Sequence, residues 1–211
     1  MFLPLIFKSE GLRGLIVGGG SVALRKITAL TESGCAVTVI APDCDLSGLP
    51  EETRRSVQVI RREFQPGDCR GFDLIIAATN DRRVNESVST EARSARIPVN
   101  VVDEPDLCSV LFPAIIRQDD LLIAVSTGGE APFMAAEFRD RIGEGIAGWG
   151  EWLRIAANFR AVVRNEMHDP EQIKRLLVRF RNLPIVMDIA APSAADSLNR
   201  WLEWMEKLEG C

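Results

Sequence analysis

The sequence predicts an α/β protein built on a parallel sheet. In the first half, short runs rich in Val, Ile and Leu alternate with stretches whose apolar residues recur at helical spacing. Three consecutive glycines separate the first apolar run from the first helical stretch, in "LIVGGGSVALRK" (15–26). Strands that alternate with helices pair in parallel, and the helices cover both faces of the sheet. After residue 103 this alternation ends.

The elements of the parallel sheet follow in order. Residues 15–17 are expected to form the first buried strand, and a helix over 21–33 ends at Gly34. Its inner face carries Ala23, Ile27 and Leu30. A second helix is expected from a cap at Asn80 to about residue 95. The remaining strands are predicted at 36–40, 56–60, 73–79 and 97–103.

The second half predicts a small hairpin followed by helices. Two apolar runs, 109–116 and 121–127, are joined by "RQDD", and Pro113 makes the first an edge or bulged strand. Gly128 and Gly129 then interrupt the chain before a helix that starts near Pro132. We expect domain boundaries near residues 112 and 148. Further helices are predicted at 149–164, 171–181 and 193–208.

Composition and charge exclude several classes of function. The chain has 211 residues and a formal net charge of -5, so it lacks the basic balance typical of proteins that bind nucleic acid or anionic membranes. Its five cysteines are scattered and contain no CxxC pair, which indicates reduced cytoplasmic thiols. No run reaches the roughly 18 apolar residues of a membrane span. The opening "MFLPLIF" lacks the basic region of a signal peptide, so we expect a cytoplasmic protein.

Two residue types are nearly or wholly missing. The chain has no tyrosine, which excludes a Tyr-x-x-x-Lys reductase, and His168 is its single histidine. Metal sites that need two or more histidines are therefore excluded, and we expect no metal site. His168 lies in a polar stretch and is expected at the surface. The tryptophans occur at helical spacing, which indicates core or interface positions for Trp149, Trp152, Trp201 and Trp204.

The glycines stand where a dinucleotide-binding turn requires them. The pattern Gly18-x-Gly20-x-x-Ala23 ends a predicted strand and opens a helix, which is the context of the Rossmann fingerprint. Gly18 permits the tight turn, Gly20 lets a pyrophosphate approach the backbone, and Ala23 permits close packing of helix on strand. Free amides at the helix N-terminus favour the phosphates. We predict a dinucleotide site, although a glycine-rich turn without a ligand has the same pattern.

Further candidate cofactor residues follow the next strands. Asp43 comes shortly after the second strand, near the usual place of the acid that binds the ribose, and its charge favours NAD over NADP. Thr79 and the small residues of "AATND" (77–81) end the fourth strand, where they leave room for the nicotinamide half. An ordinary loop acid at Asp43 and tight core packing at 77–81 are the alternatives.

Asp103 is the candidate catalytic residue. It ends the fifth strand, where partial burial would raise its pKa and suit it to proton transfer. The segment "STGGEAP" (126–132) joins a strand to a helix, and its hydroxyls and amides are candidates for binding carboxylates. A turn residue or helix cap at Asp103 and a plain loop at 126–132 stay open.

Five motifs occur together in order: "GGGSVALRK", "VTVIAPD", "AATND", "VNVVDEPDLCSVLFPAII" and "VSTGGEAP". Together they resemble the precorrin-2 dehydrogenase family, the dehydrogenase and ferrochelatase part of siroheme synthases, over about residues 1–142. The resemblance implies a homodimer and NAD-dependent oxidation of precorrin-2, a tetrapyrrole, to sirohydrochlorin. It also implies three domains: an NAD-binding Rossmann domain (1–112), a small α+β dimerisation domain (113–147) and a helical C-terminal domain (148–211).

Individual residues take expected roles from this reading. Asp103 matches the aspartate regarded as catalytic in the family, and Thr127 stands where some members have a phosphorylated serine. The expected cofactor contacts are Gly18, Gly20, Ser21, Val22, Pro42, Asp43, Thr79 and Asn80. The expected substrate contacts are Asn100, Ser126, Thr127 and Gly128. The candidate cations for the substrate carboxylates are Arg82, Arg83, Arg117, Arg139 and Arg141.

Three functions stay open on the sequence alone. The first is the dehydrogenase, and the second adds ferrochelatase (lyase) activity that inserts ferrous iron. The third is a non-catalytic module that senses NAD and regulates a partner. A sensing module needs neither a carboxylate at the cleft nor a tetrapyrrole-sized site, so Asp103 and the segment 126–132 favour an enzyme.

Overall fold

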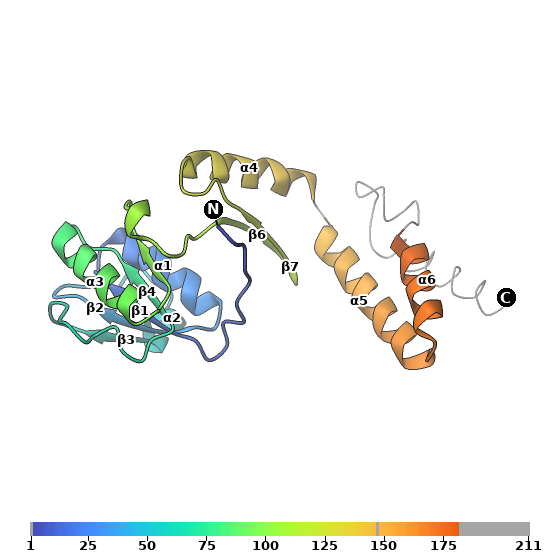
Figure 1. Cartoon of the computed structure of the whole chain (residues 1–211), viewed down its shortest axis with the longest axis horizontal. Coiled ribbons are helices and arrows are strands. Elements are labelled where there is room, and N and C mark those ends of the chain that lie inside the picture. Colours follow the sequence, from blue (N-terminus) through green and yellow to red (C-terminus); the bar gives the residue numbers. More distant parts are fainter. Residues whose placement is uncertain (1, 147, 182–211) are drawn as a thin grey trace. The chain divides into compact units, whose positions relative to one another are not determined.

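The computed structural model describes residues 2–146 and 148–181 (Figure 1). The chain divides into two compact units, Met1–Phe112 and Pro113–Cys211. Each unit has its own sheet, and each is described by itself. A further division near residue 148 stays a prediction. Within the described residues, no helix combines the length and the apolar character that crossing a bilayer requires.

A five-stranded parallel sheet forms the centre of the first unit, as the alternating pattern predicts. Its order, β3-β2-β1-β4-β5, reverses direction between β1 and β4. In the register, Val17 lies opposite both Ile40 and Ala77, and Ala77 lies opposite Val101. Four strands therefore end at the same edge of the sheet. The bounds are β1 (Arg13–Val17), β2 (Ala36–Ile40), β3 (Val57–Ile60), β4 (Leu74–Ala77) and β5 (Val99–Val101).

Helices α1 (Ser21–Glu32) and α3 (Arg82–Ser94) cover opposite faces of this sheet. Successive residues of a strand point to opposite faces, so Ile16 packs in the cluster with α1 while Leu15 packs in the cluster with α3. The predicted inner face of the first helix is confirmed, because Ala23, Ile27 and Leu30 are buried. Helices therefore cover both faces of the sheet, which explains why its strands are mostly apolar.

Several local predictions are wrong. The six-residue helix α2 (Glu51–Ser56) was not expected, because its sequence "EETRRS" buries no residue and carries no apolar period. Asp81, not Asn80, caps α3, since its carboxylate accepts a hydrogen bond from the Arg83 amide. Pro113 lies directly before β6 (Ala114–Gln118) rather than within a strand. The chain leaves the sheet earlier than expected after β4 and β5, where turns begin.

The second unit contains the predicted hairpin and helices. Strand β6 pairs antiparallel with β7 (Leu121–Val125) across a turn at Asp119 and Asp120. The rings of Phe159 and Phe180 stack with their centroids 4.4 Å apart, between the last two helices of the described residues. The helices are α4 (Pro132–Gly145), α5 (Trp149–Glu166) and α6 (Pro170–Arg181). The predicted helix over 193–208, with Trp201 and Trp204, lies outside the described residues.

Candidate functional site

The candidate residues of the first unit meet at the edge where the parallel strands end. Gly18 to Val22 follow β1, Pro42 and Asp43 follow β2, Thr79 and Asn80 follow β4, and Asp103 follows β5 shortly after its end. The strand order reverses between β1 and β4, and ligands of open α/β sheets bind outside the strand ends at such a reversal. The sheet thus gathers residues that lie more than 80 positions apart in the sequence.

The three glycines of the first turn have different reasons to be glycine. A Cβ on Gly18 would lie 2.3 Å from the main-chain oxygen of Ala78, and one on Gly19 would lie 2.1 Å from that of Asp43. Gly18 also has a φ of +118°, in the left-handed region. A Cβ on Gly20 would meet no atom within 4 Å. Contacts inside the protein therefore demand the first two glycines, and Gly20 borders open space where a ligand can approach.

The N-terminus of α1 follows directly and is built for an anion. Gly20 is its N-cap and supplies no side-chain cap, and the first helical hydrogen bond runs from the Leu24 amide to the Gly20 oxygen. The amides of Ser21, Val22 and Ala23 precede that bond and are left for a ligand. The first turn of the helix carries no acidic residue. Free amides and the helix dipole together favour a phosphate group here.

Pro42 and Asp43 are exposed just beyond β2. The main chain of Asp43 packs against Gly19, which brings this residue beside the glycine turn. Among the described residues, the Asp43 carboxylate has no hydrogen-bond or ion-pair partner. It is therefore available to the hydroxyl groups of a ribose.

Thr79 is held in place by a residue that the sequence did not single out. The Thr79 hydroxyl donates to the Asn85 side-chain oxygen (2.8 Å), and the Asn85 amide nitrogen donates to the Thr79 oxygen (3.1 Å). Asn85 lies on α3 and is only 4% exposed. A polar residue on the buried face of a helix was the signal that could have found it. Asn80, next to Thr79, is exposed and stays open to a ligand.

Asp103 occupies an unusual backbone position. The Glu104 amide donates to the Val101 oxygen (3.4 Å) and closes a turn in which Asp103 is the third residue. Its φ of 60° is left-handed, a conformation that costs an ordinary residue roughly 1–2 kcal/mol and that such turns usually give to Gly or Asn. The expected partial burial is wrong, because the side chain is exposed at the end of the sheet. Among the described residues, its carboxylate has no partner.

The segment after Asp103, residues 104–110, forms a strap that is fastened to α3. The Ser89 hydroxyl donates to the Leu107 oxygen (2.7 Å), and the Arg93 guanidinium donates to the Asp106 and Cys108 oxygens (2.9 and 3.0 Å). Arg82 pairs with Glu104 at 3.5 Å. Sequence reasoning missed Ser89 and Arg93, whose partners are main-chain oxygens that leave no mark on the sequence. Their spacing with Asn85 is four residues, one turn of helix.

Asn100, expected to bind substrate, is 7% exposed and holds the strap instead. Its amide nitrogen donates to the Val110 oxygen at 3.0 Å. Burial raises the pKa of the neighbouring Cys108 thiol, against the effects of its Val101 hydrogen bond and of Arg93. Burial also lowers the pKa of Lys26, whose ammonium lies 4.0 Å from the centre of the Phe112 ring. Lys26 thereby ties α1 to the last residue of the first unit.

The other expected substrate contacts belong to the second unit. Ser126, Thr127 and Gly128 join β7 to α4, as the sequence predicts. The Ser126 hydroxyl accepts from the Gly128 amide (3.2 Å), and the Thr127 hydroxyl accepts from the Ala131 amide (3.2 Å). Gly128 and Gly129 both have left-handed φ angles, 70° and 88°. The loop is a tight, hydroxyl-braced turn at the start of a helix.

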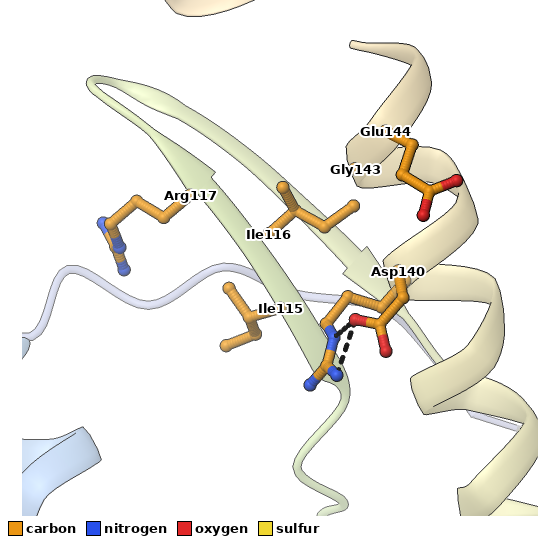
Figure 2. A pocket seen from close by; sticks show the side chains of 7 residues that line it. Ile115, Ile116, Arg117, Asp140, Gly143 and Glu144 are labelled. Carbon is orange, nitrogen blue, oxygen red and sulfur yellow. Dashed lines mark hydrogen bonds and ion pairs between the residues drawn. The ribbon is translucent and has the colours of Figure 1, made fainter. Parts of the chain in front are cut away.

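An open depression of about 560 Å³ also lies on the second unit (Figure 2). Arg139, one of the lining residues, is paired with Asp140 at 2.7 Å, whereas Arg117 has no acidic partner among the described residues. Two other candidate cations are likewise paired, Arg82 with Glu86 and Arg141 with Glu137. The depression is lined by Ile115, Ile116, Arg117, Arg139, Asp140, Gly143 and Glu144. In the described part of the chain, no three metal-ligating side chains cluster to hold an ion.

Comparisons with known proteins agree with this geometry. Residues 5–114 match the family model described as "Putative NAD(P)-binding". The chain is 42% identical over 202 residues to a siroheme synthase of Methylococcus capsulatus, which covers 95% of this chain and 42% of that protein. It is 43% identical over 173 residues to a siroheme synthase of Azotobacter vinelandii, of which it covers 37%. The chain thus spans about two fifths of the length of these relatives.

A solved structure shows the same fold. The structure described as SirC, precorrin-2 dehydrogenase, matches with a TM-score of 0.76 and covers 98% of this chain and 100% of its own. The sequence identity is 21%, so the match speaks for the fold alone. The α/β architecture with its parallel sheet is therefore one that solved proteins adopt.

Proposed function

The chain belongs to the family of NAD(P)-binding domains that forms the N-terminal module of siroheme synthases, and we propose that it oxidises precorrin-2 to sirohydrochlorin. The observation that carries the proposal is the Asp103 turn. It holds an exposed, unpaired carboxylate at the same sheet edge as the glycine turn, in a left-handed conformation that glycine would adopt with less strain. Strained non-glycine residues of this kind concentrate at active sites.

The residues of the glycine turn fit a dinucleotide. No protein atom occupies the space beside Gly20 where a Cβ would lie, and the amides of Ser21 and Val22 are available to bind a phosphate. When bound, NAD supplies a hydride acceptor. Oxidation of precorrin-2 removes one hydride and one proton, and Asp103 accepts the proton as general base. Thr79, braced by Asn85, and the exposed Asn80 border the space between these two places.

The cofactor preference follows from Asp43. Its free carboxylate beside the glycine turn accepts hydrogen bonds from the ribose hydroxyls of NAD and repels the extra phosphate of NADP. We expect NAD to bind more tightly than NADP, as measured by titration of each with the full chain. In the Asp43→Asn variant the difference between the affinities for NAD and NADP is expected to be smaller, because the negative charge is removed. Equal or tighter binding of NADP by the parent chain contradicts the role given to Asp43.

The second unit carries the other residues that we propose to contact substrate. The loop Ser126–Gly128 offers hydroxyls and amides to the substrate carboxylates, and Arg117 offers an unpaired cation. We propose that residues 113–147 form a dimerisation domain and that helices α5 and α6 belong to a separate domain that begins near residue 148. Exposed apolar side chains on β6 and α4, Ile115, Phe133, Phe138 and Ile142, support a homodimer. Sedimentation tests it, and a monomer at micromolar concentration contradicts it.

The deciding experiment is anaerobic incubation of the chain with precorrin-2 and NAD, followed by the absorbance of NADH and of sirohydrochlorin. Asp103→Ala is expected to lower the rate at least a hundredfold, roughly the scale of a positioned general base, and to leave NAD affinity nearly unchanged. Asp119→Ala is the matched control, because Asp119 is also an exposed aspartate with a left-handed φ, 49°, in the hairpin turn.

The outcomes separate the two parts of the proposal. No oxidation by the parent chain refutes the function. Oxidation by Asp103→Ala at the parent rate keeps the function and removes Asp103 from the chemistry. A loss of NAD binding in the same variant indicates that Asp103 acts on the fold of the sheet edge.

A further inference from the structure

The Cys108 thiol touches both ends of the Asp103 turn. The Val101 amide, at the first residue of the turn, donates to the Cys108 sulfur at 3.1 Å. The thiol itself lies 3.2 Å from the Val101 oxygen and 3.4 Å from the Glu104 oxygen, at the last residue of the turn. The Cys108 side chain therefore contacts the first and the last residue of the turn that contains the left-handed Asp103.

Other residues hold this thiol in place. The Arg93 guanidinium donates to the Cys108 oxygen (3.0 Å), and the Asn100 amide nitrogen lies 3.5 Å from the sulfur. The Cys108 amide donates to the Pro105 oxygen at 3.0 Å. Cys108 is thus fixed through its main chain from α3 and from the strap, and its sulfur has little freedom to leave the turn.

The protonation state of the thiol suits this position. Burial raises the pKa of Cys108, so the sulfur keeps its proton at neutral pH. A neutral thiol donates to one carbonyl oxygen while accepting from an amide, whereas a thiolate only accepts. The Val101 and Glu104 oxygens are acceptors, and the Val101 amide is a donor. The neutral form can therefore pair with both kinds of group at the end of β5, which is an edge strand of the sheet among the described residues.

We propose that Cys108 is a positioning residue for the reaction, which keeps Asp103 in the left-handed turn from which its carboxylate takes the substrate proton. The proposal rests on the proposed function. A left-handed aspartate is strained, so its surroundings must hold it there. Removing the sulfur removes its contacts with both Val101 and Glu104 and leaves the Val101 amide without the acceptor described here. Small displacements of a catalytic group lower the rate strongly.

The test compares three variants of the full chain. Cys108→Ala is expected to lower kcat for precorrin-2 oxidation about tenfold and to leave KM for NAD unchanged. Cys108→Ser restores most of the loss, because a hydroxyl both donates and accepts. Cys35→Ala is the matched control: its buried thiol also contacts a main-chain oxygen, that of Leu12 at 3.2 Å, but lies where β2 begins. It is expected to keep the parent kcat.

A second measurement reports on the turn without relying on activity. Amide hydrogen exchange over residues 99–110 is expected to quicken in Cys108→Ala, most at Val101, and to return toward the parent rate in Cys108→Ser. Unchanged exchange, or an unchanged kcat in an active chain, overturns the proposal. If the parent chain does not oxidise precorrin-2, the proposed function fails, and the exchange rates alone then support or overturn the bracing of the turn by Cys108.

Discussion

Two turns at one edge of the sheet differ in their use of side chains. The glycine turn, Gly18 to Gly20, follows β1 and removes side chains so that backbones can meet at distances no Cβ would permit. The Asp103 turn, Val101 to Glu104, follows β5 and keeps a side chain at a position where glycine would fit with less strain. Both turns follow strands that end at the same edge of one parallel sheet, with β4 between β1 and β5, so their difference does not come from lying at different edges.

The two turns differ in the kind of group that each can offer to a ligand, and the residue types and backbone conformations differ accordingly. At the glycine turn the groups offered to a ligand are main-chain amides, and a side chain would only block them. In the proposed function the group offered at the Asp103 turn is the carboxylate itself, which would account for a left-handed aspartate at this position. Local rules for turn residues are obeyed where the backbone binds and broken where a side chain is needed.

The largest effect is expected where a side chain is added to the glycine turn. In Gly18→Ala the new methyl group meets the Ala78 oxygen at 2.3 Å in a backbone conformation that alanine disfavours. We expect the free energy of unfolding to fall by about 3 kcal/mol, measured by denaturant titration. Gly34→Ala is the control, since Gly34 also has a left-handed φ but no atom within 4 Å of a new Cβ. Equal losses in the two variants would show that the close approach to Ala78 costs nothing.

Gly20→Ala sharpens the comparison within the glycine turn. No protein atom lies within 4 Å of the added Cβ, so the free energy of unfolding is expected to change by less than about 1 kcal/mol. The methyl group does occupy the space through which a pyrophosphate reaches the α1 amides. We expect NAD affinity to fall about tenfold, which corresponds to about 1.4 kcal/mol, as measured by titration. A variant that binds NAD like the parent would place the pyrophosphate elsewhere.

The smallest change in stability is expected when the Asp103 turn becomes a glycine turn. Asp103→Gly relieves a left-handed strain of roughly 1–2 kcal/mol, and the added flexibility of glycine in the unfolded chain offsets much of it. The free energy of unfolding should therefore stay within about 1 kcal/mol of the parent value while precorrin-2 oxidation is lost. Thermal unfolding and the NADH assay together check this. A clearly less stable variant would mean that the carboxylate supports the fold.

The sequence predicts the buried helices and strands better than the connecting segments and helix ends. The apolar period of Ala23, Ile27 and Leu30 and the β-branched run 36–40 report burial directly, and both elements are confirmed. Helix α2 could not be found, because a helix that buries nothing leaves no periodic signal. The cap at Asp81 was misplaced by one residue, since Asn80 and Asp81 have equal intrinsic merit as caps.

The candidate site is predictable in residue type but not in conformation. Gly18, Gly20, Asp43 and Asp103 could be chosen from their places after strands, and these positions do meet at one edge. The left-handed φ of Asp103 has no signal in the sequence, because the turn that contains it is contacted by Cys108, a residue further along the chain. Asn100, an expected substrate contact from the family resemblance, is buried and donates to the Val110 oxygen, a contact that the sequence does not indicate.

Three side chains of helix α3 hold two separate segments at the edge of the sheet. Asn85 braces the loop after β4, while Ser89 and Arg93 fasten the strap after β5, at intervals of four residues. These three attachments lie on one stripe about 12 Å long, since eight residues rise about 1.5 Å each. Inserting or deleting one residue between Asn85 and Ser89 would rotate Ser89 and Arg93 by about 100° relative to Asn85. Helix α3 could then no longer hold both the loop after β4 and the strap after β5. The spacing of residues within α3 is therefore constrained by these three attachments, whereas α2 buries none of its residues.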